Sequence, residues 1–171
     1  MFYINSFFIY SILGFLFESI IGFFRKTGFS SGILYGPWTP IYGIGANIIL
    51  ILSDYIFHGL NFVKWREVII VFFAVMIILT FIEWLGGVLI EKFFHVVFWN
   101  YEDFEHHIGK YIAIEVSLLW GVLSLILIYC IHPFLSSFII KIPWYITYFL
   151  ILLMVIDYIL TFIKYKKRTL K

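Results

Sequence analysis

The chain has little charge and a single cysteine, and both shortages restrict what it can be. Charged residues make up 13% of its 171 residues, and the formal net charge is only +2, so a broad surface for nucleic acid is excluded. With Cys130 alone, the chain forms no intramolecular disulfide and no Cys-x-x-Cys site. The GxxxxGK[ST], GxSxG and HExxH motifs are also missing, so we expect neither an enzyme nor a bound cofactor.

Apolar residues, in contrast, are abundant. They make up 63% of the chain, aromatic residues alone 23%, and the mean hydropathy is +1.03. A bilayer core needs about 20 apolar residues per helix. The sequence therefore predicts an all-α polytopic membrane bundle, a single domain over 1–163 surrounded by lipid. The predicted spans are about 2–24, 38–57, 68–90, 111–131 and 143–163, and a basic cytoplasmic tail occupies 164–171.

The distribution of Lys and Arg predicts the orientation of these spans in the cell membrane. With the N-terminus outside and the C-terminus cytoplasmic, nine of the twelve basic residues lie on the cytoplasmic side. This agrees with the excess of Lys and Arg in the cytoplasmic loops of membrane proteins.

The segment of about residues 92–108 has apolar residues at helical spacing. They predict a helix lying in the inner headgroup region with its apolar face toward the lipid. The alternative is that the segment extends the third span. Because His106 and His107 would point about 100° apart on a helix, we predict no metal site here.

Acidic residues within the spans are the first candidates for a site. An acid at the centre of a membrane helix costs about 2.5–3.5 kcal/mol, so it needs water, a cation or a proton. Glu18 and Glu83 lie deepest in the cytoplasmic half, and we predict that they line a binding site. Glu91 and Glu115 are also candidates, although nearby Lys and Arg residues could pair with them structurally. Glu18 and Glu91 each end a Gly-x-Leu-x-Glu motif, a hint of two repeated hairpins.

The segment Gly32–Ala46 is rich in glycine and proline. Proline forbids a continuous helix, although Pro40 suits the first turn of the second span. We interpret the segment as a broken helix lining a substrate site, with Tyr35, Gly36, Pro37, Pro40 and Tyr42 as candidate binding residues. The alternative is a tight turn followed by small residues for helix packing.

These motifs carry a family resemblance. The series from Tyr10 to Glu18, the block from Leu34 to Ala46, and the later residues Glu83, Glu91, Trp99-x-Tyr101 and Trp120-Gly121 resemble the CmpB-like family of putative ABC-transporter permeases (type IV). The resemblance covers about residues 10–121, implies a membrane component of a transporter, and adds Trp120 to the candidate binding residues. The chain departs from the family in Asn100, where an Asp is usual, which speaks against acid chemistry in this loop.

Three functions follow from these residues. The first is a permease component that moves a small polar solute through an acidic cytoplasmic-half site. It would need a separate cytoplasmic ATPase, docked on residues 92–110 and the tail, and five short spans favour a homo-oligomer. The second is a protein that handles lipid headgroups. The third is a membrane scaffold that transports nothing.

Overall fold

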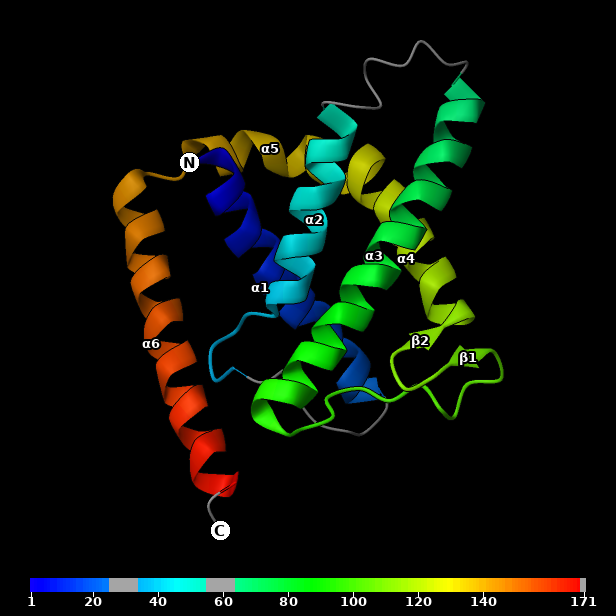
Figure 1. Ribbon diagram of the computed structural model, residues 1–171. Coiled ribbons are helices and arrows are strands. Elements are labelled where there is room, and N and C mark those ends of the chain that lie inside the picture. Colours follow the sequence, from blue (N-terminus) through cyan, green and yellow to red (C-terminus); the bar gives the residue numbers. More distant parts are fainter. Residues whose placement is uncertain (25–33, 55–63, 170–171) are drawn as a thin grey trace.

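The computed structural model describes residues 1–24, 34–54 and 64–169, and shows a helical bundle with one small β-hairpin (Figure 1). The elements, in chain order, are α1 (Phe2–Phe24), α2 (Pro40–Leu52), α3 (Lys64–Phe94), β1 (His107–Ile108), β2 (Ile112–Ala113), α4 (Ile114–Ile126), the π-helical turn η2 (Leu127–Ile131), α5 (His132–Lys141) and α6 (Trp144–Thr169). The predicted all-helical membrane bundle is confirmed.

Four stretches of helix are long and apolar enough to cross a membrane: Phe2–Phe24, Trp65–Phe94, Ile114–Lys141 and Trp144–Lys166. The second predicted span is shorter than expected. Its helix α2 has 13 residues and is therefore about 20 Å long, less than the roughly 30 Å of a bilayer core. Residues 55–57 of that prediction lie outside the described residues. Pro40 begins α2, where its missing N–H leaves no bond unmade.

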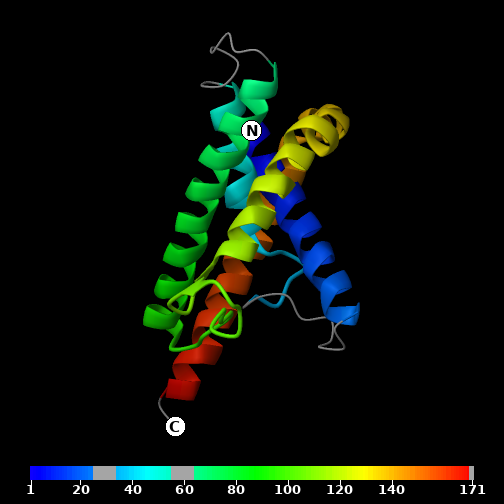
Figure 2. The same cartoon turned by 90° about the vertical axis from the view of Figure 1, so that its right-hand side faces the viewer.

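The helices pack as two neighbouring hairpins, α1 with α2 and α3 with α4 (Figures 1 and 2). Glycines allow the close approach within each hairpin. A Cβ atom on Gly43 would lie 2.5 Å from the carbonyl oxygen of Phe7, and one on Gly121 would lie 2.6 Å from the ring of Phe72. Small residues at helix contacts serve the same purpose in many membrane bundles.

The fourth predicted span continues beyond residue 131 and then changes direction. After α4, the turn η2 leads into α5, which lies across the end of the bundle near the N-terminus (Figure 1). Pro133 explains the change, because it removes one backbone donor and its ring displaces the preceding turn. Ile139 of α5 is fully buried against the bundle, while Phe134 and Phe138 are exposed and would contact the lipid interface.

The predicted interfacial helix over residues 92–108 is wrong, and the alternative of a longer third span holds only to Phe94. His95 takes a positive φ of 54°, which ends α3, and the chain continues without helix to the hairpin of β1 and β2. Two aromatic residues of this segment turn toward the protein, although Phe93 is 63% exposed. Tyr101 bonds to α3, and the ring of Trp99 lies against Gly86 and Tyr111.

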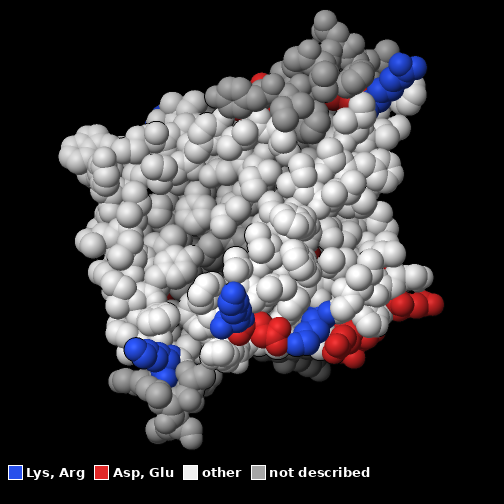
Figure 3. Space-filling view, in the orientation of Figure 1, with Lys and Arg blue, Asp and Glu red and all other residues white. Residues whose placement is uncertain are grey.

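The two ends of the bundle carry the charged side chains. Figure 3 shows Lys, Arg, Asp and Glu gathered near opposite edges of one face, with a wide uncharged band between them. The N- and C-terminal ends of the described chain lie at opposite ends of the bundle (Figure 1). These features describe a multi-pass membrane protein. That the C-terminal end faces the cytoplasm stays a prediction.

Candidate functional site

Glu18 of α1 and Glu83 of α3 belong to one cluster of aromatic and carboxylate side chains. The hydroxyl of Tyr42 donates a hydrogen bond to Oε1 of Glu18. Glu83 accepts two bonds, from the Tyr101 hydroxyl at 2.6 Å and from the Trp120 indole N–H at 2.9 Å. The rings of Tyr42 and Trp120 meet edge to face, with centroids 5.5 Å apart. We call these five residues the aromatic–carboxylate cluster.

The cluster contains two carboxyl groups without a basic partner in the described part of the chain. Glu83 is 5% exposed, and the two ion pairs found there, His106–Glu115 and Lys110–Glu91, involve neither carboxylate of the cluster. The pKa of Tyr101 is raised well above its ordinary value, first by burial, then by the charge of Glu83 and of Glu18. Both carboxylates are therefore close enough to influence the hydroxyl of Tyr101.

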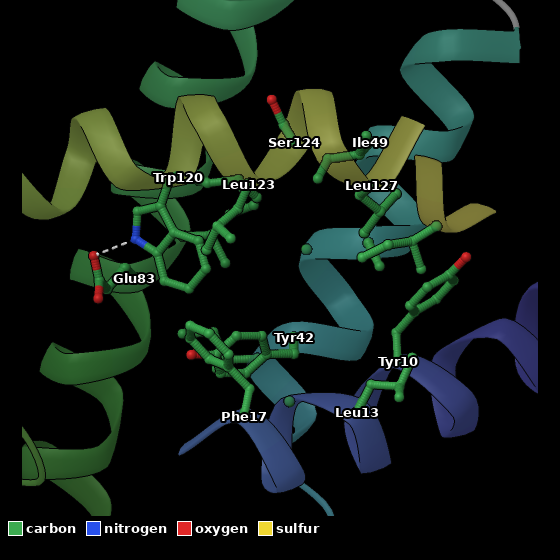
Figure 4. Close-up of a pocket in the computed structure, with 17 residues that line it drawn as sticks. Tyr10, Leu13, Phe17, Tyr42, Ile49, Glu83, Trp120, Leu123, Ser124 and Leu127 are labelled. Carbon is green, nitrogen blue, oxygen red and sulfur yellow. Dashed lines mark hydrogen bonds between the residues drawn. The ribbon is translucent and has the colours of Figure 1, made fainter. Parts of the chain in front are cut away.

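A cavity of about 160 Å³ extends from this cluster between the two hairpins (Figure 4). Trp120 and Tyr42 face each other near Glu83, and Tyr10 lies toward the other end of the space. The hydroxyl of Tyr10 is 2.8 Å from Nδ1 of His132. Most of the remaining lining is aliphatic and comes from four α-helices and the turn η2: Leu13, Ile41, Ile49, Leu79, Leu123 and Leu127. The arrangement offers a polar end and a long apolar body.

The repeated Gly-x-Leu-x-Glu motif corresponds to a repeated contact. In each hairpin a tyrosine ring covers the glycine, and its hydroxyl donates to the glutamate four residues later. The two sets are Gly14, Glu18 and Tyr42 in the first hairpin, and Gly87, Glu91 and Tyr111 in the second. Each hairpin is thus closed by its own tyrosine, and the hint of a repeat in the sequence has a structural counterpart.

The predicted site residues Glu91 and Glu115 lie apart from the cavity and have basic partners. Glu91 accepts hydrogen bonds from Lys110 and Tyr111, both at 2.7 Å, and Glu115 lies 2.9 Å from His106. The bond to Glu91 raises the pKa of Lys110, and burial raises that of Tyr111 to about 12. These contacts fit the structural alternative, because they fasten the loop after α3 to α3 and α4.

The loop before α2 is held by a buried carboxylate of α6. Asp157 accepts hydrogen bonds from the backbone N–H groups of Tyr35 and Gly36 at 2.9 and 2.7 Å, and from the Trp38 indole at 2.8 Å. Thr161 donates a fourth bond at 3.2 Å. Such charge-assisted bonds are about twice as strong as neutral ones, so Asp157 is a strong anchor for this loop.

The predicted residues of this segment therefore divide between two places. Tyr42 lies in the aromatic–carboxylate cluster. Tyr35, Gly36 and Pro37 do not line the cavity, and Pro40 only begins α2. Residues 32 and 33 lie outside the described residues. Residues 34–39 are irregular backbone in which Trp38 is buried and Tyr35 is exposed, and their contacts favour the alternative of a turn that serves packing.

The sequence of this chain matches one known family. The match covers residues 5–163, nearly the whole chain. The chain belongs to the family described as putative ABC-transporter type IV. No curated protein and no solved structure matches it. Membership confirms the resemblance carried by the motifs, and indicates a multi-pass membrane protein of a transporter-type family.

Two residues with central contacts in this member of the type IV family, Tyr101 and Asp157, were not predicted as candidate site residues. Tyr101 reaches Glu83 across 18 residues because the chain turns back after α3, and its one signal was its place in the Trp99-x-Tyr101 motif of the family. Asp157 lies within the last predicted span, 143–163. Its partners include backbone N–H groups, which every residue except proline carries, so nothing in the sequence pointed to them.

Proposed function

We propose that the protein is the membrane-embedded, solute-binding component of a transporter, with its site at the aromatic–carboxylate cluster and the adjoining cavity. Membership of the type IV family supports the transporter part. One observation carries the site: Glu83 lines the end of an apolar cavity, Glu18 lies beside it through its bond to Tyr42, and no described Lys or Arg forms an ion pair with either. Acids inside membrane bundles commonly mark the path of a solute or ion.

The hydrogen bonds of the cluster support a mechanism based on movement between hairpins. The bond from Tyr42 to Glu18 lies within the first hairpin, and the bonds from Tyr101 and Trp120 to Glu83 lie within the second hairpin and its loop. The two halves meet here through the edge-to-face rings of Tyr42 and Trp120. One hairpin can therefore tilt against the other without breaking these bonds, which is how many transporters expose a central site alternately.

The energy for such a cycle would come from a separate subunit. The chain has no P-loop, so we expect an ATPase to bind at the end of the bundle that carries the loop of residues 95–113 and the end of α6. A homo-oligomer would enlarge the interior that a bundle of this size offers.

Lipid handling is the second candidate, and the aliphatic lining of the cavity favours it. A small polar solute alone would leave most of this lining without a suitable partner. Either function therefore takes a ligand with a substantial apolar part. A scaffold role would be enough to explain the paired Glu91 and Glu115, but it leaves the unpaired charge at Glu83 without a purpose.

Two measurements test the proposed function. Native mass spectrometry of the gently solubilised complex is expected to show a stoichiometric ATPase subunit. Cells producing wild type or Glu83→Gln at equal membrane levels are expected to differ in at least one small molecule across the membrane. The matched control is Glu67→Gln, which changes a glutamate in the first turn of α3, away from the loop of residues 95–113. A bare chain, with identical solute profiles for wild type and Glu83→Gln, would refute the proposal.

A further inference from the structure

We propose that the aromatic–carboxylate cluster binds the head of a lipophilic organic ammonium ion, whose aliphatic body occupies the adjoining cavity. The inference rests on the proposed function, and it names the chemical class of the ligand. Four properties of the site carry it: its charge, its aromatic rings, its aliphatic lining and its contact with the bilayer-facing surface.

The charge of the site calls for a cation. Glu83 is almost fully buried and Glu18 is half-buried, and both influence the hydroxyl of Tyr101. None of the ion pairs or cation–π contacts in residues 1–24, 34–54 and 65–166 places a Lys or Arg on this cluster. Buried carboxylates need a compensating partner, and a bound monocation would provide it.

The aromatic rings determine what kind of cation fits. The rings of Phe17 and Tyr42 lie 6.3 Å apart, those of Tyr42 and Trp120 5.5 Å apart, and both pairs meet edge to face. Three adjoining rings beside two carboxylates are the chemistry that recognises alkylammonium groups, because the ring faces attract a cation that has few water molecules to lose. A small hydrated metal ion would gain little from these rings.

The remaining lining determines the body of the ligand. Beyond the rings the cavity is lined by aliphatic side chains of α1, α2, α3 and α4. Leu13 and Phe17 line it and are still 38% and 36% exposed, so the cavity reaches the surface that would face the bilayer. In Figure 2 the axes of α1 and α4 diverge away from the end where α5 lies. A molecule dissolved in the membrane could therefore enter from the side.

A phosphate group beside the ammonium would be disfavoured. Phosphate is normally held by Arg, Lys or a helix N-terminus, and it would stand here beside two carboxylates. Three described basic side chains make contacts elsewhere: Lys110 with Glu91, Lys164 with Tyr35 and Arg66 with Trp65. We therefore infer a simple cation and not a zwitterionic lipid headgroup.

Three short-chain probes test this choice on the purified wild-type protein in dodecyl maltoside, an uncharged detergent. Hexyltrimethylammonium carries the cation alone, hexylphosphocholine adds a phosphate, and hexanesulfonate carries only an anion. We expect hexyltrimethylammonium to raise the midpoint of thermal unfolding and to bind saturably in calorimetry, with hexanesulfonate inactive. Equal or tighter binding of hexylphosphocholine would overturn the inference in favour of a lipid headgroup, and no binding of hexyltrimethylammonium would overturn it outright.

Variants then locate the binding. Glu83→Gln should weaken hexyltrimethylammonium binding by about tenfold or more, because it removes one partner of a buried charge pair. Trp120→Leu should also weaken it, whereas the control Glu67→Gln should match wild type. Unchanged binding by Glu83→Gln would overturn the assignment of the site. The probe comparison needs wild type alone, so it decides the ligand class even if a variant fails to fold. If Glu83→Gln changes the solute profiles but hexyltrimethylammonium does not bind, the proposed function is supported and the proposed ligand class is refuted.

Discussion

Two adjacent glycines of α3 provide a sharp test of the packing. A Cβ atom on Gly87 would lie 2.6 Å from Cδ1 of Tyr111, closer than real side chains approach. A Cβ atom on Gly86 would meet Ile41 at 3.6 Å and Trp99 at 3.7 Å, which are ordinary contacts. The same substitution by alanine should therefore have opposite effects at neighbouring positions.

The magnitudes follow from three contributions. Replacing glycine by alanine inside a helix stabilises it by about 1 kcal/mol at either position. At Gly87 the added methyl displaces the Tyr111 ring, and overpacking of this kind costs about 1–3 kcal/mol. The ring is also tied to Glu91 by a hydrogen bond of 2.7 Å, whose loss adds about 1 kcal/mol. We expect Gly86→Ala to be neutral or stabilising. The free energy of unfolding of Gly87→Ala should be about 2–4 kcal/mol lower than that of Gly86→Ala.

Detergent-induced unfolding measures this difference. Both variants are purified in a mild detergent and titrated with dodecyl sulfate, and the free energy of unfolding is taken from tryptophan fluorescence. Adding Tyr111→Ser should remove most of the penalty of Gly87→Ala, because the ring that blocks the methyl is gone. Equal stability of the two alanine variants would refute the close contact between α3 and Tyr111.

Three further predictions concern the anchors of the loops. Asp157→Asn should lower the free energy of unfolding by about 2–4 kcal/mol in the same titration, because an amide cannot accept all the bonds that the carboxylate accepts; wild-type stability would contradict its role as anchor. Tyr101→Phe should lower it by about 1–3 kcal/mol and should increase labelling of Glu83 by a lipophilic carbodiimide, and unchanged labelling would show that Tyr101 does not shield it. The hydrogen bond to Glu91 raises the pKa of Lys110 above its ordinary value of about 10.4. The contribution of this bond to the free energy of unfolding is therefore complete at neutral pH and is lost as the pH rises through the raised pKa. The fall in the thermal midpoint over this range should be smaller in Lys110→Met, and an equal fall would contradict the assignment.

Much of the membrane architecture could be predicted from the sequence, because helix-forming apolar stretches need only length and composition. The segment of residues 92–108 shows where this fails. Its aromatic residues have helical spacing, but a positive φ at His95 ends the helix, and Tyr101 and Trp99 turn toward the protein. Spacing alone cannot distinguish a lipid-facing stripe from aromatic side chains that pack inward along an extended chain.

The site was partly predictable for a similar reason. The energetic penalty of a carboxylate within a span drew attention to Glu18 and Glu83, and the structure places both in one cluster. The partners of these acids depend on contacts between distant segments, such as the bond from Tyr101 to Glu83. The contacts of the glycine–proline loop could not be predicted, because they depend on Asp157, which lies 122 residues after Tyr35.

This long separation affects how the protein is made. The loop that joins the first two helices leaves the ribosome long before α6, the last described helix, and until then the N–H groups of Tyr35 and Gly36 lack their acceptor. Once Asp157 has been made, it can accept these bonds from a loop more than 100 residues before it. A chain that ends before α6 would therefore leave these two N–H groups without their carboxylate acceptor. In this fold the loop before α2 reaches its final contacts only after α6 has been made.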